Sequence, residues 1–118
     1  MIGTQSNYQY IVPDEENPQR IALAVSEIRL DSTPSFRREL MRYLHEHPGD
    51  TVLDVSGLDY TDTSGIATLI QAEAFKLREG STLKLDGLHG EPEGILENTR
   101  LKDLFLHPHP GRLRHQPV

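Results

Sequence analysis

The sequence predicts an α/β fold, a mixed and mostly parallel sheet of about four to five strands with helices packed on it. Apolar runs typical of strands alternate with amphipathic stretches typical of helices, in the order β-β-α-β-α-β-α. Strands separated by helices become parallel neighbours through right-handed crossovers. The length of 118 residues fits one domain of ordinary size.

The first two strands are expected to pair as an antiparallel hairpin. Tyr8 to Val12 is rich in aromatic and β-branched side chains, and Ile21 to Val25 is a second apolar run. Between them lies Pro13 to Pro18, which is dense in turn-forming residues. This link is too short for the crossover that a parallel pair needs.

The first helix is expected to begin with Thr33 as its N-cap and Pro34 at its first helical position, where the fixed φ of proline suits the helix. His47-Pro48-Gly49 should end it. Its apolar side chains recur at helical spacing, and they are Phe36, Leu40, Tyr43 and Leu44.

A third strand is expected at Thr51 to Val55, whose nearly continuous apolar pattern is typical of a strand covered on both faces. The second helix should begin near Asp62 and stop at Glu79-Gly80. One stripe of this helix is expected to lie in the core, and it comprises Ile66, Leu69, Ile70, Ala74 and Leu77.

The last two elements are a strand and a helix. Leu83 and Leu85 alternate with polar residues, which indicates a fourth strand. The stretch from Ile95 to Phe105 has a helical apolar pattern, and Pro92 and Gly94 limit where that helix can begin.

Composition argues against several kinds of partner and location. Twelve basic and eighteen acidic residues give a formal charge of −6, with no basic cluster evident, so neither nucleic acid nor an anionic bilayer is an expected partner. The chain has no cysteine, which excludes disulfides and thiolate sites. Its start lacks the pattern of a secretory signal, and its longest apolar run, Ile21 to Val25, is far shorter than the roughly 20 residues that span a bilayer. We therefore expect a cytoplasmic protein that reaches a membrane only through a partner.

The most informative stretch joins the third strand to the second helix. Gly57 permits a tight turn after the buried strand, and a polar Asp-Thr-Ser-Gly run then opens the helix. Asp62 can accept a hydrogen bond from the free amides of the first turn, which stabilises a helix by about 1 kcal/mol. Gly65 allows another part of the chain to approach the backbone closely.

The two halves of this stretch, Asp54-x-Ser56-Gly57 and Asp62-Thr63-Ser64-Gly65, resemble the STAS family of sulfate transporters and anti-sigma-factor antagonists. The resemblance extends over residues 8–106, through Gly80–Leu85 and the closing Leu101–Phe105, with Arg29-Leu30-Asp31 at an acidic-led turn before the first helix. It implies the STAS fold, which we expect as one domain at residues 1–106. The stretch from His107 has three prolines and no helical stripe, so residues 107–118 are expected to form a flexible C-terminal tail.

In antagonists of this family, the residue after the second aspartate is phosphorylated by a kinase that is itself the anti-sigma factor. The resemblance therefore implies that Thr63 is the phosphorylation site, with Ser64 as the less favoured alternative, and that phosphorylation releases the kinase. The residues expected to contact the partner are Asp31, Asp59, Asp62, Thr63, Ser64, Gly65 and Ile66.

A second role is implied by free-standing STAS subunits of bacterial ABC transporters that move phospholipids. These subunits bind the transporter ATPase and commonly carry Asp-Thr-x-Gly, which Asp62-Thr63-Ser64-Gly65 also satisfies. The threonine then supports assembly and need not be phosphorylated.

Simpler interpretations stand beside these two. The Asp-Thr-Ser-Gly run could be a helix cap and no more, although capping and signalling are compatible. His45 and His47 are two apart on a helix and cannot readily share an ion, whereas the tail histidines could bind a transition metal weakly, and these are His107, His109 and His115.

Catalysis is not expected. Asp54, Asp59 and Asp62 could converge as carboxylates, but no nucleophile-and-base pair is evident beside them. The chain lacks both glycine-rich nucleotide-binding motifs, so no cofactor is expected either.

Overall fold

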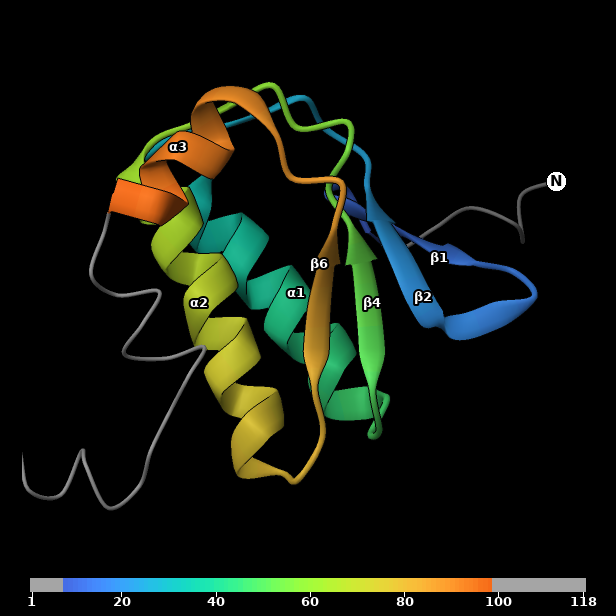
Figure 1. The fold of residues 1–118 in the computed structure, drawn as a ribbon. Helices are drawn as coiled ribbons and strands as arrows, with labels where there is room; N and C mark the ends of the chain where they lie inside the picture. Colours follow the sequence, from blue (N-terminus) through green and yellow to red (C-terminus); the bar gives the residue numbers. More distant parts are fainter. Residues whose placement is uncertain (1–7, 99–118) are drawn as a thin grey trace, which may run out of the picture.

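The computed structural model describes residues 8–98 (Figure 1). The elements run in the order β1 (Ile11–Asp14), β2 (Asn17–Leu23), β3 (Glu27–Ile28), α1 (Thr33–Glu46), β4 (Thr51–Asp54), β5 (Tyr60–Thr61), α2 (Thr63–Arg78), β6 (Leu83–Asp86) and α3 (Gly90–Asn98). The predicted α/β class and order of major elements are confirmed, with β3 and β5 as additions.

The main sheet has the strand order β1-β2-β4-β6. β1 and β2 form the expected antiparallel hairpin, and β2, β4 and β6 are parallel. β2 begins at Asn17, four residues before the predicted start, because Asn17 pairs with Asp14 of β1 and Arg20 pairs with Val52 of β4. A strand with one polar face need not begin where its apolar run begins.

A second, two-stranded sheet was not anticipated. β3 pairs with β5 in parallel, with Glu27 opposite Tyr60 and Ile28 opposite Thr61. Strands of two residues are too short to show any periodicity. This small sheet places the segment that leads into α1 beside the segment that leads into α2.

The helices α1 and α2 lie on one face of the main sheet, and the other face is open (Figure 1). Leu53 of β4 is fully buried, whereas Val52 and Asp54 on the opposite face are only half-buried. The prediction that this strand is covered on both faces is therefore wrong. The α2 stripe around Ile66 and Leu69 is buried, as expected.

Two buried charged side chains tie α1 to its surroundings. The Lys76 ammonium donates to the carbonyls of Leu44, His47 and Gly49 at 3.3, 2.7 and 2.9 Å. These carbonyls belong to the C-terminal end of α1 and the loop after it, where a cation also complements the helix dipole. At the other side of α1, the Glu39 carboxylate accepts hydrogen bonds from three consecutive backbone amides, those of Gln9, Tyr10 and Ile11.

Both helix starts that contain proline differ from prediction. The N-cap of α1 is Ser32 rather than Thr33, so Pro34 follows the first helical residue. The Thr33 hydroxyl faces Arg29 and α2 instead of capping its own helix. α3 begins at Gly90 rather than Ile95, because Pro92 is tolerated within a first helical turn.

The remaining predictions for the C-terminal part fall outside the described residues. These are the end of the third helix at Phe105, the domain boundary at residue 106 and the tail with its three histidines. Among residues 8–98, no helix combines the length and apolar character needed to cross a membrane.

Candidate functional site

The candidate site lies where the N-terminal ends of α1 and α2 meet the loops that follow the parallel strands (Figure 1). The carboxyl ends of β4 and β6 point toward this end of the molecule, and α3 sits beside the start of α2. Loops at the carboxyl ends of parallel strands are a usual place for binding sites in α/β folds.

Asp62 caps α2. Its backbone is extended (φ −93°, ψ −177°), and its carboxylate accepts a hydrogen bond from the Ser64 hydroxyl at 2.6 Å and from the Gly65 amide at 3.4 Å. The Ser64 bond is the main cause that holds the pKa of Asp62 below its usual value. Asp62 therefore carries its charge at neutral pH, at the positive end of the helix dipole.

The Ser64 hydroxyl also joins the two helices. Its Oγ lies 2.8 Å from the Oγ1 of Thr33, which is the first residue of α1. The Thr33 hydroxyl lies 3.0 Å from the Arg29 carbonyl as well, but that carbonyl already accepts from the amides of Ser32 and Thr33. Because Ser64 uses its one proton on Asp62, the Thr33 hydroxyl is the donor when these two hydroxyls bond.

Thr63 differs from Ser64 in exposure and in hydrogen bonding. It occupies the first position of α2 and is exposed, and within residues 8–98 no hydrogen bond involves its hydroxyl. Ser64 is half-buried and bonded on two sides. The two adjacent hydroxyls thus have different accessibility, with Thr63 facing solvent.

Gly65 and Ile66 lie beneath the surface. A side chain at position 65 would place its Cβ 2.0 Å from the Thr61 Oγ1 and 3.1 Å from Ile28. The chain that approaches Gly65 is therefore the small β3–β5 sheet. Ile66 is fully buried, so its side chain can shape the site but cannot touch a partner.

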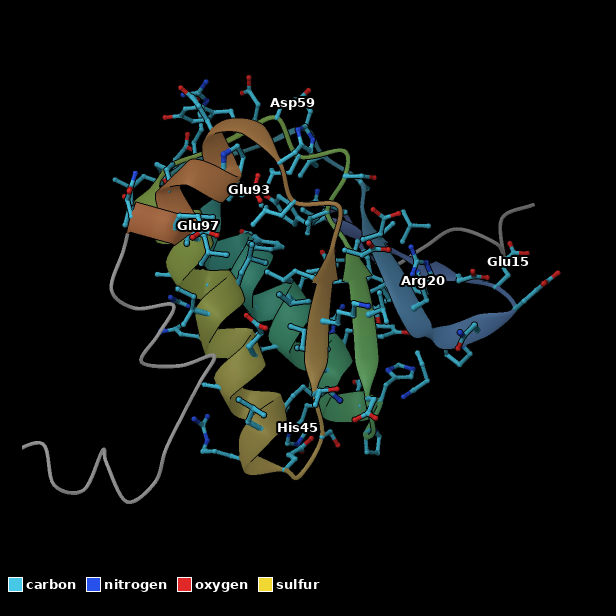
Figure 2. The ribbon with its side chains drawn as sticks, viewed as in Figure 1. Glu15, Arg20, His45, Asp59, Glu93 and Glu97 are labelled. Atoms are coloured by element: carbon cyan, nitrogen blue, oxygen red, sulfur yellow. The ribbon has the colours of Figure 1, made fainter. Side chains whose placement is uncertain are left out.

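Asp31 and Asp59 are exposed near this end of the molecule, and Figure 2 shows Asp59 pointing away from the fold. Their sequence neighbours Arg29, Leu30 and Tyr60 were not predicted as contact residues from the sequence. Leu30 is 70% exposed, and the Arg29 guanidinium lies over the Tyr60 ring, 4.3 Å from its centroid. An exposed leucine beside a stacked arginine and tyrosine is typical of a protein-binding surface.

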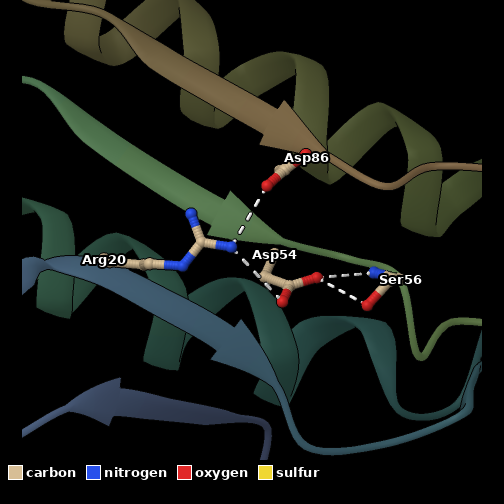
Figure 3. Close-up of polar contacts among 4 residues, drawn as sticks. All are labelled: Arg20, Asp54, Ser56 and Asp86. Atoms are coloured by element: carbon tan, nitrogen blue, oxygen red, sulfur yellow. Dashed lines mark hydrogen bonds and ion pairs between the residues drawn. The ribbon is translucent and has the colours of Figure 1, made fainter.

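Asp54 takes a different role from Asp62. Its Oδ1 accepts from the amide and hydroxyl of Ser56 at 2.9 and 2.7 Å, and these bonds lower its pKa. Its Oδ2 lies 3.5 Å from Arg20, whose guanidinium also reaches Asp86 at 3.1 Å (Figure 3). Asp54 thus closes the turn after β4 and helps to tie three parallel strands together on the open face.

The two histidines His45 and His47 contact different aromatic rings. His47 stacks on Tyr43 with ring centroids 3.9 Å apart and bonds the Tyr43 carbonyl, whereas His45 lies beside Phe75. Within the described part of the chain, no group of three acidic or histidine side chains is placed to hold an ion.

Comparison with known proteins agrees with this arrangement. The fold and the capped Asp-Thr-Ser-Gly helix start define a STAS domain. The chain belongs to the STAS family described as "Mlab, STAS domain", whose sequence profile matches residues 12–107. No curated protein sequence matches it.

Two solved structures align with part of this chain. The murine anion transporter Slc26a9, solved in its inward-facing state, aligns with a TM-score of 0.61 at 15% identity over 71% of this chain. The aligned region is 14% of the transporter chain, so the match concerns the fold alone. A crystal structure of Mglu aligns with a TM-score of 0.49 and 13% identity over 70% of this chain and 19% of that chain, too weakly to carry an argument.

Proposed function

We propose that this STAS domain is an anti-sigma-factor antagonist that binds an anti-sigma kinase and is released from it when Thr63 is phosphorylated. The observation that carries the proposal is the contrast between neighbouring hydroxyls. Thr63 is exposed and unbonded at the first position of α2, whereas Ser64 is committed to Asp62 and Thr33. A kinase can reach the first hydroxyl without unfolding the helix start.

Charge explains how the modification would act. A phosphate on Thr63 adds about −1.5 to −2 charges directly beside the ionised Asp62. Helix amides tolerate such a group locally. A partner packed over the helix start would have to bury it next to a carboxylate, which costs binding free energy.

The docking surface that we propose extends beyond the motif. It comprises the exposed helix start at Thr63 together with Leu30, Arg29 and Tyr60. Tyrosine and arginine are enriched among the residues that dominate binding, and the contact of Arg29 with the Tyr60 ring reduces the side-chain freedom that binding would have to remove. Asp31 and Asp59 would lie at the rim, where they tune association rate more than affinity.

The direct test is incubation with a cognate anti-sigma kinase and ATP, followed by mass mapping of the phosphate. We expect phosphate on Thr63 in the wild type and in Ser64→Ala, and none in Thr63→Ala. Binding to the same kinase should survive Thr63→Ala and fail in Thr63→Glu. The matched control is Thr82→Glu, an exposed threonine at the opposite end of α2. Phosphate elsewhere, or equal binding by both glutamate variants, contradicts the proposal.

A second candidate is the ATPase-binding subunit of a lipid ABC transporter. Asp62-Thr63-x-Gly65 fits the motif of that class, and an exposed Thr63 hydroxyl is free to bond a partner directly. The two candidates predict opposite results for one variant. Thr63→Ala should weaken ATPase binding if the threonine supports assembly, whereas it should leave kinase binding intact if the threonine is a switch.

A further inference from the structure

A polar pocket lies between α1 and the segment that leads into β1. It has a volume of about 230 Å³. The residues that line it are Gln9, Tyr10, Ser35, Arg38, Glu39 and Arg42. Ser35 follows Thr33 by two positions, which is about 200° around a helix, so the pocket and the Thr33–Ser64 contact lie on opposite sides of α1.

The two arginines of this pocket have no carboxylate partner. Within residues 8–98, neither Arg38 nor Arg42 forms an ion pair, although seventeen of the chain's eighteen acidic residues lie in this range. The one carboxylate that lines the pocket, Glu39, is already committed to the backbone. It accepts from the amides of Gln9, Tyr10 and Ile11 at 2.8, 2.6 and 3.0 Å. Two guanidinium groups against one carboxylate give the pocket a local positive charge in an acidic protein.

The other polar side chains of the pocket can donate hydrogen bonds. The Arg38 guanidinium lies 3.4 Å from the Ser35 Oγ and donates to it, which leaves the hydroxyl proton of Ser35 available. The Gln9 amide and the Tyr10 hydroxyl are further donors. The Arg42 guanidinium lies over the Tyr8 ring, 5.2 Å from its centroid, and this contact restricts the arginine side chain. Several donors around a committed acceptor favour a ligand that accepts hydrogen bonds and carries negative charge.

We propose that this pocket binds a phosphate dianion, either inorganic phosphate or the phosphate group of a small soluble ester. The planar guanidinium of arginine matches phosphate through paired hydrogen bonds. A phosphate monoester brings three acceptor oxygens and a charge of about −1.5 to −2, which two arginines can neutralise. A carboxylate brings only two oxygens and one charge.

Size and position agree with such a ligand. One water occupies about 30 Å³ of liquid. The pocket therefore has room for a phosphate group and a small substituent beside the half-buried Tyr10. The inference is independent of the proposed function, because the pocket lies on the side of α1 that faces away from Ser64.

An NMR titration of the ¹⁵N-labelled chain at constant ionic strength tests the proposal, with inorganic phosphate and phenyl phosphate as the two ligands. We expect saturable shifts of the backbone amides of Gln9, Tyr10 and Ser35. Arg38→Gln and Arg42→Gln should each weaken binding about tenfold, the loss expected when a hydrogen bond to a charged group is removed.

The matched control is Arg37→Gln. Arg37 is an exposed arginine on the same helix, and it does not line the pocket. Because solvent and salt screen a charge outside the pocket, this variant should change the affinity by less than about twofold.

The outcomes separate a built site from general attraction to positive charge. Shifts that do not saturate overturn the proposal, as does equal weakening by Arg37→Gln and the two pocket variants. Tighter binding of phenyl phosphate than of inorganic phosphate would assign the pocket to an ester. Equal binding of the two ligands would assign it to the inorganic ion.

Discussion

The two ends of α2 both connect this helix to α1, but they do so in opposite surroundings. At the N-terminal end, two hydroxyls and one carboxylate link the half-buried Asp62 and Ser64 to the buried Thr33. At the C-terminal end, the fully buried Lys76 bonds three carbonyls of α1 and its following loop.

This difference in burial indicates which end of α2 can accept a modification or a partner. The surface end can gain a phosphate or a partner, because water already solvates Thr63. The buried end cannot lose its cation without leaving three carbonyls short of a partner away from water. The N-terminal end therefore suits the regulation that we propose, whereas we expect the C-terminal end to contribute stability.

The largest effect is expected from Lys76→Met, which keeps the volume of the side chain but removes the ammonium. The three carbonyls lose a charged donor inside the protein, so the free energy of unfolding should fall by roughly 3 kcal/mol. Urea denaturation measures this free energy of unfolding. The control is Lys84→Met, at an exposed lysine on β6, which should change the free energy of unfolding little. A loss below about 1 kcal/mol would remove the basis for the comparison.

Gly65→Ala tests how tightly the surface end is packed. The new Cβ would meet the Thr61 hydroxyl at 2.0 Å, so we expect a loss of about 1–3 kcal/mol from overpacking. Gly57→Ala is the control, since an added Cβ there meets nothing within 4 Å. Thr61→Ala in the Gly65→Ala chain should recover part of the loss, and no recovery would mean that the cost lies elsewhere.

Ser64→Ala removes the hydroxyl that Asp62 and Thr33 share. We expect a loss of about 1 kcal/mol, as for other capping bonds. Ser81→Ala, at the other end of α2, is the control. Equal losses in the two variants would show that the Thr33–Ser64–Asp62 chain does not stabilise the helix starts.

The same variant has a pH signature. Because the folded chain holds the pKa of Asp62 below 3.8, this group adds stability above that pH, and the contribution is lost as the pH falls through the folded value. In Ser64→Ala the pKa should move up toward 3.8, and acid should remove less stability than in the wild type. A carbon-detected NMR titration of the Asp62 carboxyl measures the pKa directly, and an unchanged pKa refutes the assigned cause.

The smallest effect on stability is expected from Thr63→Ala. An exposed side chain without bonds should change the free energy of unfolding by no more than about 0.5 kcal/mol. Thermal unfolding of this variant should be compared with that of Thr61→Ala, which changes a buried threonine two residues earlier and should destabilise the protein more. A loss comparable to that of Thr61→Ala would mean that Thr63 is structural, which weakens its proposed role as a switch.

Local chemistry was enough to predict much of this molecule. The apolar stripe of α2, the capping role of Asp62, the close approach at Gly65 and the β1–β2 hairpin all follow from side chains near each other in sequence. Caps, turns and periodic stripes are decided within a few residues, so the sequence carries much of their signal, although the N-cap of α1 is Ser32 and not the predicted Thr33.

Only the tertiary structure revealed the β3–β5 sheet, the exposed Leu30 and the buried Lys76. Two-residue strands carry no periodic signal, and a lysine in a helix pattern is ordinarily assigned to the surface. Whether Lys76 is buried depends on carbonyls about thirty positions away in sequence, which a local pattern cannot see. Interactions between residues close in sequence therefore determine the helices and the cap of α2. The packing of α1 on α2 determines which polar groups of these helices face water.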